Sequence, residues 1–95
     1  MKLKTVTFDA TCAGWTPNRD SNLMFIKNTE HSMNSLISRG GYIYLDMICM
    51  SLGVKRDPYD EFVCLRDVND GKITYVEFET FVQADNTILV NILTI

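Results

Sequence analysis

The segment 40–53 most strongly constrains this chain, because it joins a chain-reversal signal to a short amphipathic helix. The two adjacent glycines at its start accept positive φ at low steric cost, so they predict the end of one helix and a reversal of the chain. Residues 42–44 are aromatic or β-branched and favour an extended backbone. Asp46 is suited to cap the next helix, and Gly53 is suited to end it in the left-handed conformation. The segment therefore predicts a hinge between a helical first half and a strand-rich second half.

Two amphipathic helices are predicted. The longer one starts with a cap at Asp20, Ser21 or Asn22 and continues to about Ser38. Its apolar residues fall on one side at helical spacing: Leu23, Ile26, Met33, Leu36 and Ile37. The shorter helix has apolar residues at i, i+3, i+4 and i+7: Leu45, Ile48, Cys49 and Leu52. Each helix is therefore expected to pack one face against a core.

Strands are predicted at the amino terminus and through the second half. Residues 2–8 are rich in β-forming side chains. Three more strands are predicted at residues 61–66, 73–82 and 87–95. The Asp70-Gly71 pair is the strongest hairpin signal in the chain, and the short loops favour antiparallel neighbours.

The composition predicts one domain spanning residues 1–95. Apolar residues make up 46% and charged residues 22% of the chain, as in ordinary globular proteins. A chain of this length can build one modest core. The predicted fold is α+β, with a long helix and a capped short helix packed on a small antiparallel sheet of three to four strands.

Charge and hydrophobicity exclude several classes of function. The net charge of −3 disfavours direct nucleic-acid binding by phosphate neutralisation. No apolar run approaches the roughly 20 residues that span a bilayer, and no signal peptide is evident, so no membrane association is expected. The three cysteines form no C-x-x-C pair, which favours a reduced, cytoplasmic setting.

No constellation for catalysis, cofactor binding or metal binding is found. His31 is the only histidine, and no cysteine or carboxylate stands at zinc-ligand spacing around it. It also has no partner with which to build a Ser-His or Cys-His nucleophile. The prediction is a protein that is not an enzyme and that has no cofactor.

A degenerate EF-hand is the main structural alternative. Residues 70–78 are similar to the second half of a calcium loop, with Gly71 at the bend and Glu77 as the bidentate ligand. In that register the first and third ligand positions are Arg66 and Val68, which supply no oxygen ligand. This alternative requires a helix after the loop.

The segment Gly41-Tyr42-Ile43-Tyr44-Leu45-Asp46, followed by Leu52-Gly53-Val54, resembles the core motif of a family of small, uncharacterised phage and prophage proteins. The resemblance covers residues 23–54, with a weaker similarity at 87–92. It implies a helix, a Gly-aromatic segment, a capped helix and then strands, in a protein of phage or mobile-element origin. Residues 55–61 lack the longer loop and the Gly-Trp pair usual in that family, so no role of that loop is transferred.

The expected function is binding of another protein through an acidic surface. Carboxylates along a strand can imitate phosphates and occupy a basic groove, as in small phage-encoded inhibitors of host nucleases. By that analogy the partner is a host defence nuclease complex in the host cytoplasm, and the protein is an anti-CRISPR-like inhibitor. The predicted contact residues are Tyr59, Asp67, Asp70, Tyr75, Glu77 and Glu79. The alternatives are a solvated sheet surface and a structural or accessory phage protein that self-associates through residues 23–26 or the terminal strand.

Overall fold

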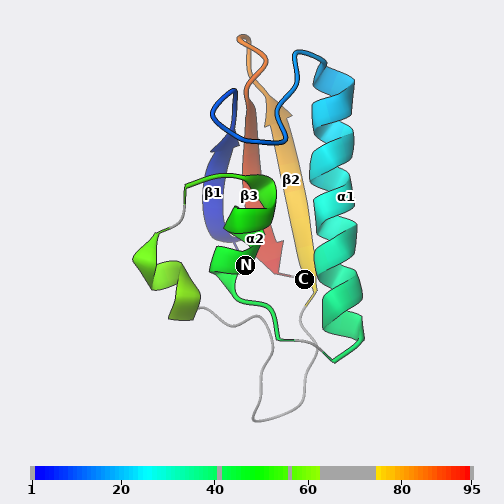
Figure 1. Ribbon diagram of the computed structural model, residues 1–95, viewed down its shortest axis with the longest axis vertical. Coiled ribbons are helices and arrows are strands. Elements are labelled where there is room, and N and C mark those ends of the chain that lie inside the picture. The colour runs from blue at the N-terminus through cyan, green and yellow to red at the C-terminus, as the bar shows by residue number, and fades with distance from the viewer. Residues whose placement is uncertain (1, 41, 56, 63–74, 95) are drawn as a thin grey trace.

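The structure is a computed structural model that describes residues 2–40, 42–55, 57–62 and 75–94 (Figure 1). Its elements follow in the order β1 (Lys2–Phe8), α1 (Arg19–Ser38), α2 (Leu45–Leu52), the 3-10 helix η1 (Pro58–Phe62), β2 (Val76–Val82) and β3 (Ile88–Thr94). This arrangement confirms the predicted α+β fold, with two α-helices packed on a three-stranded antiparallel sheet.

The carboxy-terminal strand β3 is the middle strand of the sheet, whose order is β1-β3-β2. It pairs antiparallel with β2 through a short hairpin and antiparallel with β1 from the opposite end of the chain. Both backbone edges of β3 are therefore occupied. The outer edges of the sheet belong to β1 and β2.

One face of the sheet forms the core, because apolar residues alternate along all three strands. The buried side chains of that face are Val6, Phe8, Val76, Phe78, Ile88, Val90 and Ile92. In Figure 1, α2 lies over this face and α1 runs alongside β2. The predicted apolar side of α2 is confirmed, since all four of its residues are buried. On α1, Leu36 departs from the prediction and is 40% exposed.

Phe8 is the centre of an aromatic cluster beside the helices. Its ring stacks on Phe25 of α1 with centroids 5.5 Å apart and lies 5.9 Å from the ring of Trp15. Phe8 is fully buried, and the other two rings are partly buried. The loop after β1 is therefore fastened to the core by aromatic packing.

The cap of α1 lies earlier than predicted. Asn18 is the N-cap residue, and its Oδ1 accepts a hydrogen bond from the Ser21 N–H at 2.9 Å. Asn22, one of the predicted caps, is buried instead and exchanges hydrogen bonds with the backbone N–H and C=O of Thr16 at 2.9 and 2.8 Å. The helix ends at Ser38, as predicted.

The prediction for the start of α2 was wrong by two residues, and the prediction for its end is confirmed. Tyr44 is the N-cap residue without a side-chain cap bond, and Asp46 lies in the first turn. Gly53 adopts the left-handed conformation with φ 77°. A Cβ at this position would lie 3.1 Å from the backbone nitrogen of Ala13, so the site favours glycine for space as well as for φ.

The segment before β2 differs from the sequence prediction where the structure describes it. Residues 61 and 62, predicted as the start of a strand, lie in η1. The Asp70-Gly71 turn and the rest of that predicted strand lie outside the described residues. Val76–Val82 is a strand, whereas an EF-hand requires a helix there, so the EF-hand alternative does not fit this fold.

Candidate functional site

The face of the sheet opposite the core carries polar and apolar side chains that the helices leave exposed or half-buried. We call it the open face, and it consists of Thr5, Thr7, Glu77, Glu79, Phe81, Leu89, Asn91 and Leu93. A polar row crosses all three strands. Thr5 Oγ1 donates to Asn91 Oδ1 at 2.6 Å, and Asn91 Nδ2 donates to Glu79 Oε1 at 3.0 Å. This row fixes the Glu79 carboxylate in position on the surface.

Apolar side chains lie on either side of the polar row. Phe81 is 48% exposed and lies opposite Leu89, which lies opposite Thr7. Leu93 lies opposite Glu77 at the other end of the face. The open face therefore combines exposed carboxylates with apolar surface.

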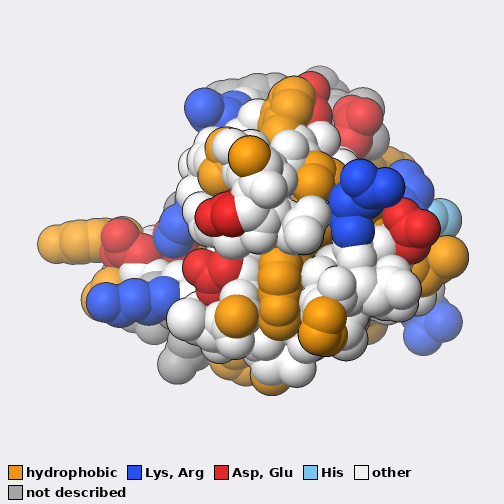
Figure 2. All heavy atoms as spheres, turned by 90° about the horizontal axis from the view of Figure 1, so that it is seen from above, with side chains coloured by type: hydrophobic (Ala, Val, Ile, Leu, Met, Phe, Trp, Pro, Cys, Tyr) orange, Lys and Arg blue, Asp and Glu red, His pale blue; other side chains and the backbone are white. Residues whose placement is uncertain are grey.

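The charge of this region is mixed. Glu77 and Glu79 point to the same side of β2, about 7 Å apart at strand geometry. Lys27 of α1 lies near enough for the Glu77 charge to add to the effect of Glu30, whose hydrogen bond and charge raise the pKa of the lysine. Viewed along the long axis of the molecule, acidic, basic and apolar side chains are interspersed (Figure 2). On the open face itself, the acidic side chains are those of Glu77 and Glu79.

The outer edge of β2 is partly closed by two side chains of α1. Backbone N–H and C=O groups along an antiparallel strand point alternately to one neighbour and the other. Those of Val76 and Phe78 bond to α1, so those of Thr80, the next even-numbered residue, also point away from β3. Asn34 Oδ1 accepts from the Val76 N–H at 2.9 Å, and Asn34 Nδ2 donates to the Val76 carbonyl at 2.9 Å. Glu30 Oε2 accepts from the Phe78 N–H at 2.6 Å. The helix thus substitutes for a fourth strand over this part of the edge.

Glu30 is the buried charge of this arrangement. It is 6% exposed, and its second oxygen, Oε1, accepts from Lys27 Nζ at 2.8 Å. Both carboxylate oxygens therefore have a charged or backbone donor, as burial of a carboxylate requires. Neither Glu30 nor Asn34 was among the residues predicted from the sequence to form a site. The sequence feature that could have indicated them is their spacing, because Glu30 and Asn34 follow Ile26 by four and eight residues. This spacing places two polar residues on the apolar side of the helix.

The predicted contact residues do not all lie together. Glu77 and Glu79 are exposed on the open face, and Tyr75 precedes β2 with 38% exposure. Tyr59 is 78% exposed but belongs to η1, which lies beyond β1 on the opposite side of the sheet from β2 (Figure 1). Tyr59 is therefore separated from the two glutamates by the width of the sheet. Asp67 and Asp70 lie outside the described residues.

The predicted self-association patch is largely used inside the chain. Of residues 23–26, Phe25 stacks on Phe8 and Ile26 is 1% exposed, so Met24 is the side chain that projects, at 61% exposure. The terminal strand β3 has both edges paired. Strand addition between two copies would therefore have to use an outer edge.

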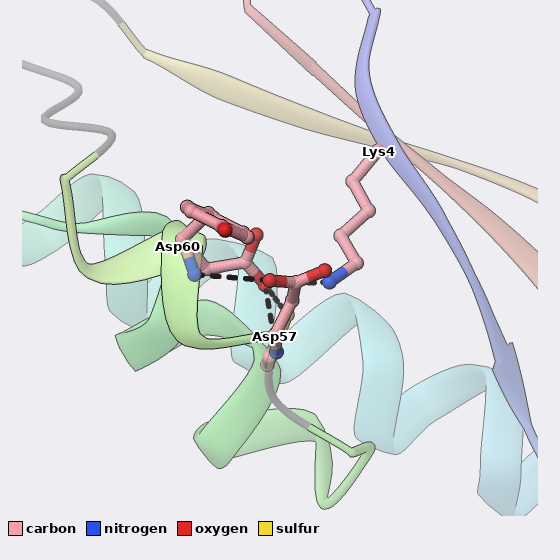
Figure 3. A network of polar contacts seen from close by, with 5 residues as sticks. Lys4, Asp57 and Asp60 are labelled. Carbon is pink, nitrogen blue, oxygen red and sulfur yellow. Dashed lines mark hydrogen bonds and ion pairs between the residues drawn. The ribbon is translucent and has the colours of Figure 1, made fainter.

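A second polar cluster joins β1, α2 and η1. Lys4 extends from β1 toward the carboxylate of Asp60 on η1 (Figure 3), with Nζ 2.5 Å from Oδ2. The buried Cys49 thiol donates to the same oxygen at 3.7 Å, and the Asp57 N–H donates to it at 3.4 Å. Three donors thus converge on one oxygen of Asp60, and the cluster holds η1 against β1 and α2.

The charges in this cluster stabilise each other. Burial alone would raise the pKa of Asp60, but the Lys4 hydrogen bond and the Asp57 N–H outweigh burial and hold that pKa below its ordinary value of 3.8. Burial likewise opposes the Lys4 charge, and the Asp60 hydrogen bond raises the pKa of Lys4 above 10.5. Burial raises the pKa of the Cys49 thiol to about 11, so the thiol is protonated at neutral pH and unreactive as a nucleophile.

We expect replacement of Lys4 by methionine to destabilise the protein by about 1–3 kcal/mol near pH 7, because Asp60 would keep its charge without its cation. The contribution of Asp60 is present above its unfolded pKa near 4 and is lost as the pH falls through its lower folded pKa. That of Lys4 is fully present below its unfolded pKa of 10.5 and is lost as the pH rises through its higher folded pKa.

The difference in unfolding free energy between the wild type and Lys4→Met, measured by urea denaturation from pH 2 to 8, should therefore shrink below pH 4. Lys55→Met, at an exposed lysine nearby, is the control and should show no such pH dependence. A difference that stays constant down to pH 2 would contradict the ion-pair account.

Within the described residues, no group of three or more histidine, cysteine or acidic side chains could hold a metal ion. None of the described helices is both long and apolar enough to cross a lipid bilayer.

No protein-family model, curated protein or solved structure matched this chain.

Proposed function

We propose that this protein is a non-enzymatic binding module that contacts a partner protein through the open face of its sheet. The observation that carries the proposal is the exposure of Glu77, Glu79 and Phe81 on one strand beside half-buried Leu89 and Leu93. The hydrogen-bonded row through Asn91 supports it, because a carboxylate that is already positioned loses less side-chain entropy on binding.

The proposed partner presents basic side chains next to an apolar surface. Two carboxylates about 7 Å apart match neighbouring cations in a basic groove. The finer proposal is that this groove belongs to a host defence nuclease complex in the bacterial cytoplasm, which makes the protein an anti-CRISPR-like inhibitor of phage or mobile-element origin. The resemblance of residues 23–54 to small phage and prophage proteins supports that origin.

The test begins with capture of a partner from bacterial lysate on the tagged protein, followed by affinity measurements with the purified partner at several salt concentrations. We expect Glu77→Gln with Glu79→Gln to weaken binding about tenfold or more and to flatten its salt dependence, because two charge contacts of about 0.7 kcal/mol each are removed. Glutamine at position 79 can still accept the Asn91 hydrogen bond, so the surface should keep its shape.

The matched control is Asn28→Lys with Ser32→Lys, which makes the same +2 change in net charge on the exposed side of α1. This control should bind as the wild type does. If both double variants lose affinity equally, the effect is one of net charge, and if neither does, the acidic contact is wrong.

A further inference from the structure

We propose that the part of the β2 edge from Phe78 to Val82 binds an extended segment of the partner, which adds to the sheet as a fourth strand. This inference rests on the proposed function and specifies how the partner is bound. Its recognition chemistry is a backbone in β conformation whose side chains alternate between apolar and basic.

Within the described part of the chain, the backbone of this part of the edge has no hydrogen-bond partner where α1 stops supplying polar groups. Asn34 bonds to Val76, and Glu30 bonds to Phe78. The two helix residues are four positions apart, or about 6 Å along α1, and the two strand residues are about 6.8 Å apart along β2. Four residues further toward the start of α1 lies Ile26, next to Thr80 of β2. The aliphatic side chain of Ile26 has no group that could bond to the strand backbone. No described residue bonds to the edge-facing N–H of Thr80 or to the carbonyl of Phe78.

A groove lies at this place, between the first half of α1 and the second half of β2. It has a volume of about 340 Å³ and is lined by Leu23, Ile26, Lys27, Phe78 and Thr80. In Figure 1 the axes of α1 and β2 diverge toward this end of the molecule. The groove thus provides space for a strand beside backbone donors and acceptors that no described residue pairs, which is the arrangement used in β-strand addition.

The two sides of the groove determine the side chains that would fit. A strand added here has every second side chain directed toward Leu23, Ile26 and Phe78, which favours apolar residues. Its other side chains lie on the open face next to Glu77 and Glu79, which favours lysine or arginine, because opposite charges on neighbouring strands attract. Lys27 at the rim of the groove is already paired with Glu30, so its charge does not require an acidic residue in the bound strand.

The probe is a synthetic seven-residue peptide in which valine and lysine alternate, titrated into ¹⁵N-labelled protein and followed by NMR. We expect saturable shifts centred on the amides of Phe78, Thr80 and Val82, and at least tenfold slower hydrogen exchange at Thr80. A peptide in which glutamate replaces lysine should bind at least tenfold more weakly. Shifts centred on Thr5 and Thr7 of the β1 edge, or no saturation, would overturn the proposal.

Two N-methylated forms of the peptide test the backbone contacts without changing the protein. One carries the methyl groups on the valine amides and the other on the lysine amides. A strand presents only one of these sets to β2, so one form should lose at least tenfold in affinity and the other should bind like the parent. Equal binding of both forms and the parent would show that no strand is added.

The captured partner separates this inference from the proposed function. If the partner needs Glu77 and Glu79 and also slows hydrogen exchange at the Thr80 amide, both stand. If it needs the two glutamates but leaves Thr80 exchange unchanged, strand addition is wrong and the open-face contact stands. If its binding needs neither glutamate, the proposed open-face contact is wrong, and the strand addition that rests on it is wrong as well.

Discussion

Replacing Phe8 with alanine is expected to lower the free energy of unfolding by about 3–5 kcal/mol, as do other deletions of a buried aromatic ring. Phe8 is fully buried at the end of β1, and its ring lies 5.5 Å from that of Phe25 and 5.9 Å from that of Trp15. Its removal would leave a cavity among β1, the following loop and α1. A domain of this size has about 5–15 kcal/mol of stability in total, so the variant should be close to unfolding.

Urea denaturation followed by circular dichroism measures this loss. Phe81→Ala is the matched control, because the same ring is removed from a residue of the open face that is 48% exposed. The control should cost less than about 1 kcal/mol. Equal losses for the two variants would show that the aromatic cluster is not part of the core.

Replacing Glu30 with alanine should cost about 2–3 kcal/mol, because the Phe78 N–H would lose a charged acceptor at a buried position. Glu30→Gln keeps an oxygen that can accept from Phe78 and loses the charge that faces Lys27, so its cost should be nearer 1 kcal/mol. Thermal and urea denaturation of the two variants give the difference.

Glu77→Ala is the control for this series, because Glu77 lies next to Phe78 on β2 but its carboxylate is exposed. Its effect on the free energy of unfolding should lie within about 0.5 kcal/mol. If the Glu30→Ala variant is as stable as this control, Glu30 does not close the β2 edge.

Much of the fold could be predicted because its local patterns agree with its tertiary structure. In β2 and β3, alternation placed Val76, Phe78, Ile88 and Val90 on the buried face, as observed. The end of α2 followed from Gly53, whose conformation few other residues adopt. The start of α1 was harder to locate, because several neighbouring residues can act as caps and only the fold decides among them.

The candidate site was only partly predictable. The exposure of Glu77 and Glu79 followed from strand alternation. The sequence did not show that β1 would pair with β3, which makes β2 an edge strand, because strands far apart in the chain carry no local signal of their pairing. Without that edge, Glu30 and Asn34 had no evident partner, and Tyr59 could not be assigned to the opposite side of the sheet.

Residue-specific amide hydrogen exchange in the free protein is the most direct test of the half-closed β2 edge. The account predicts slow exchange at Val76 and Phe78, which donate to Asn34 and Glu30, and fast exchange at Thr80. In Glu30→Ala, the Phe78 amide should exchange faster relative to that of Val90 in the middle strand. Thr80 exchange as slow as that of Phe78, or no change at Phe78 in the variant, would contradict the account.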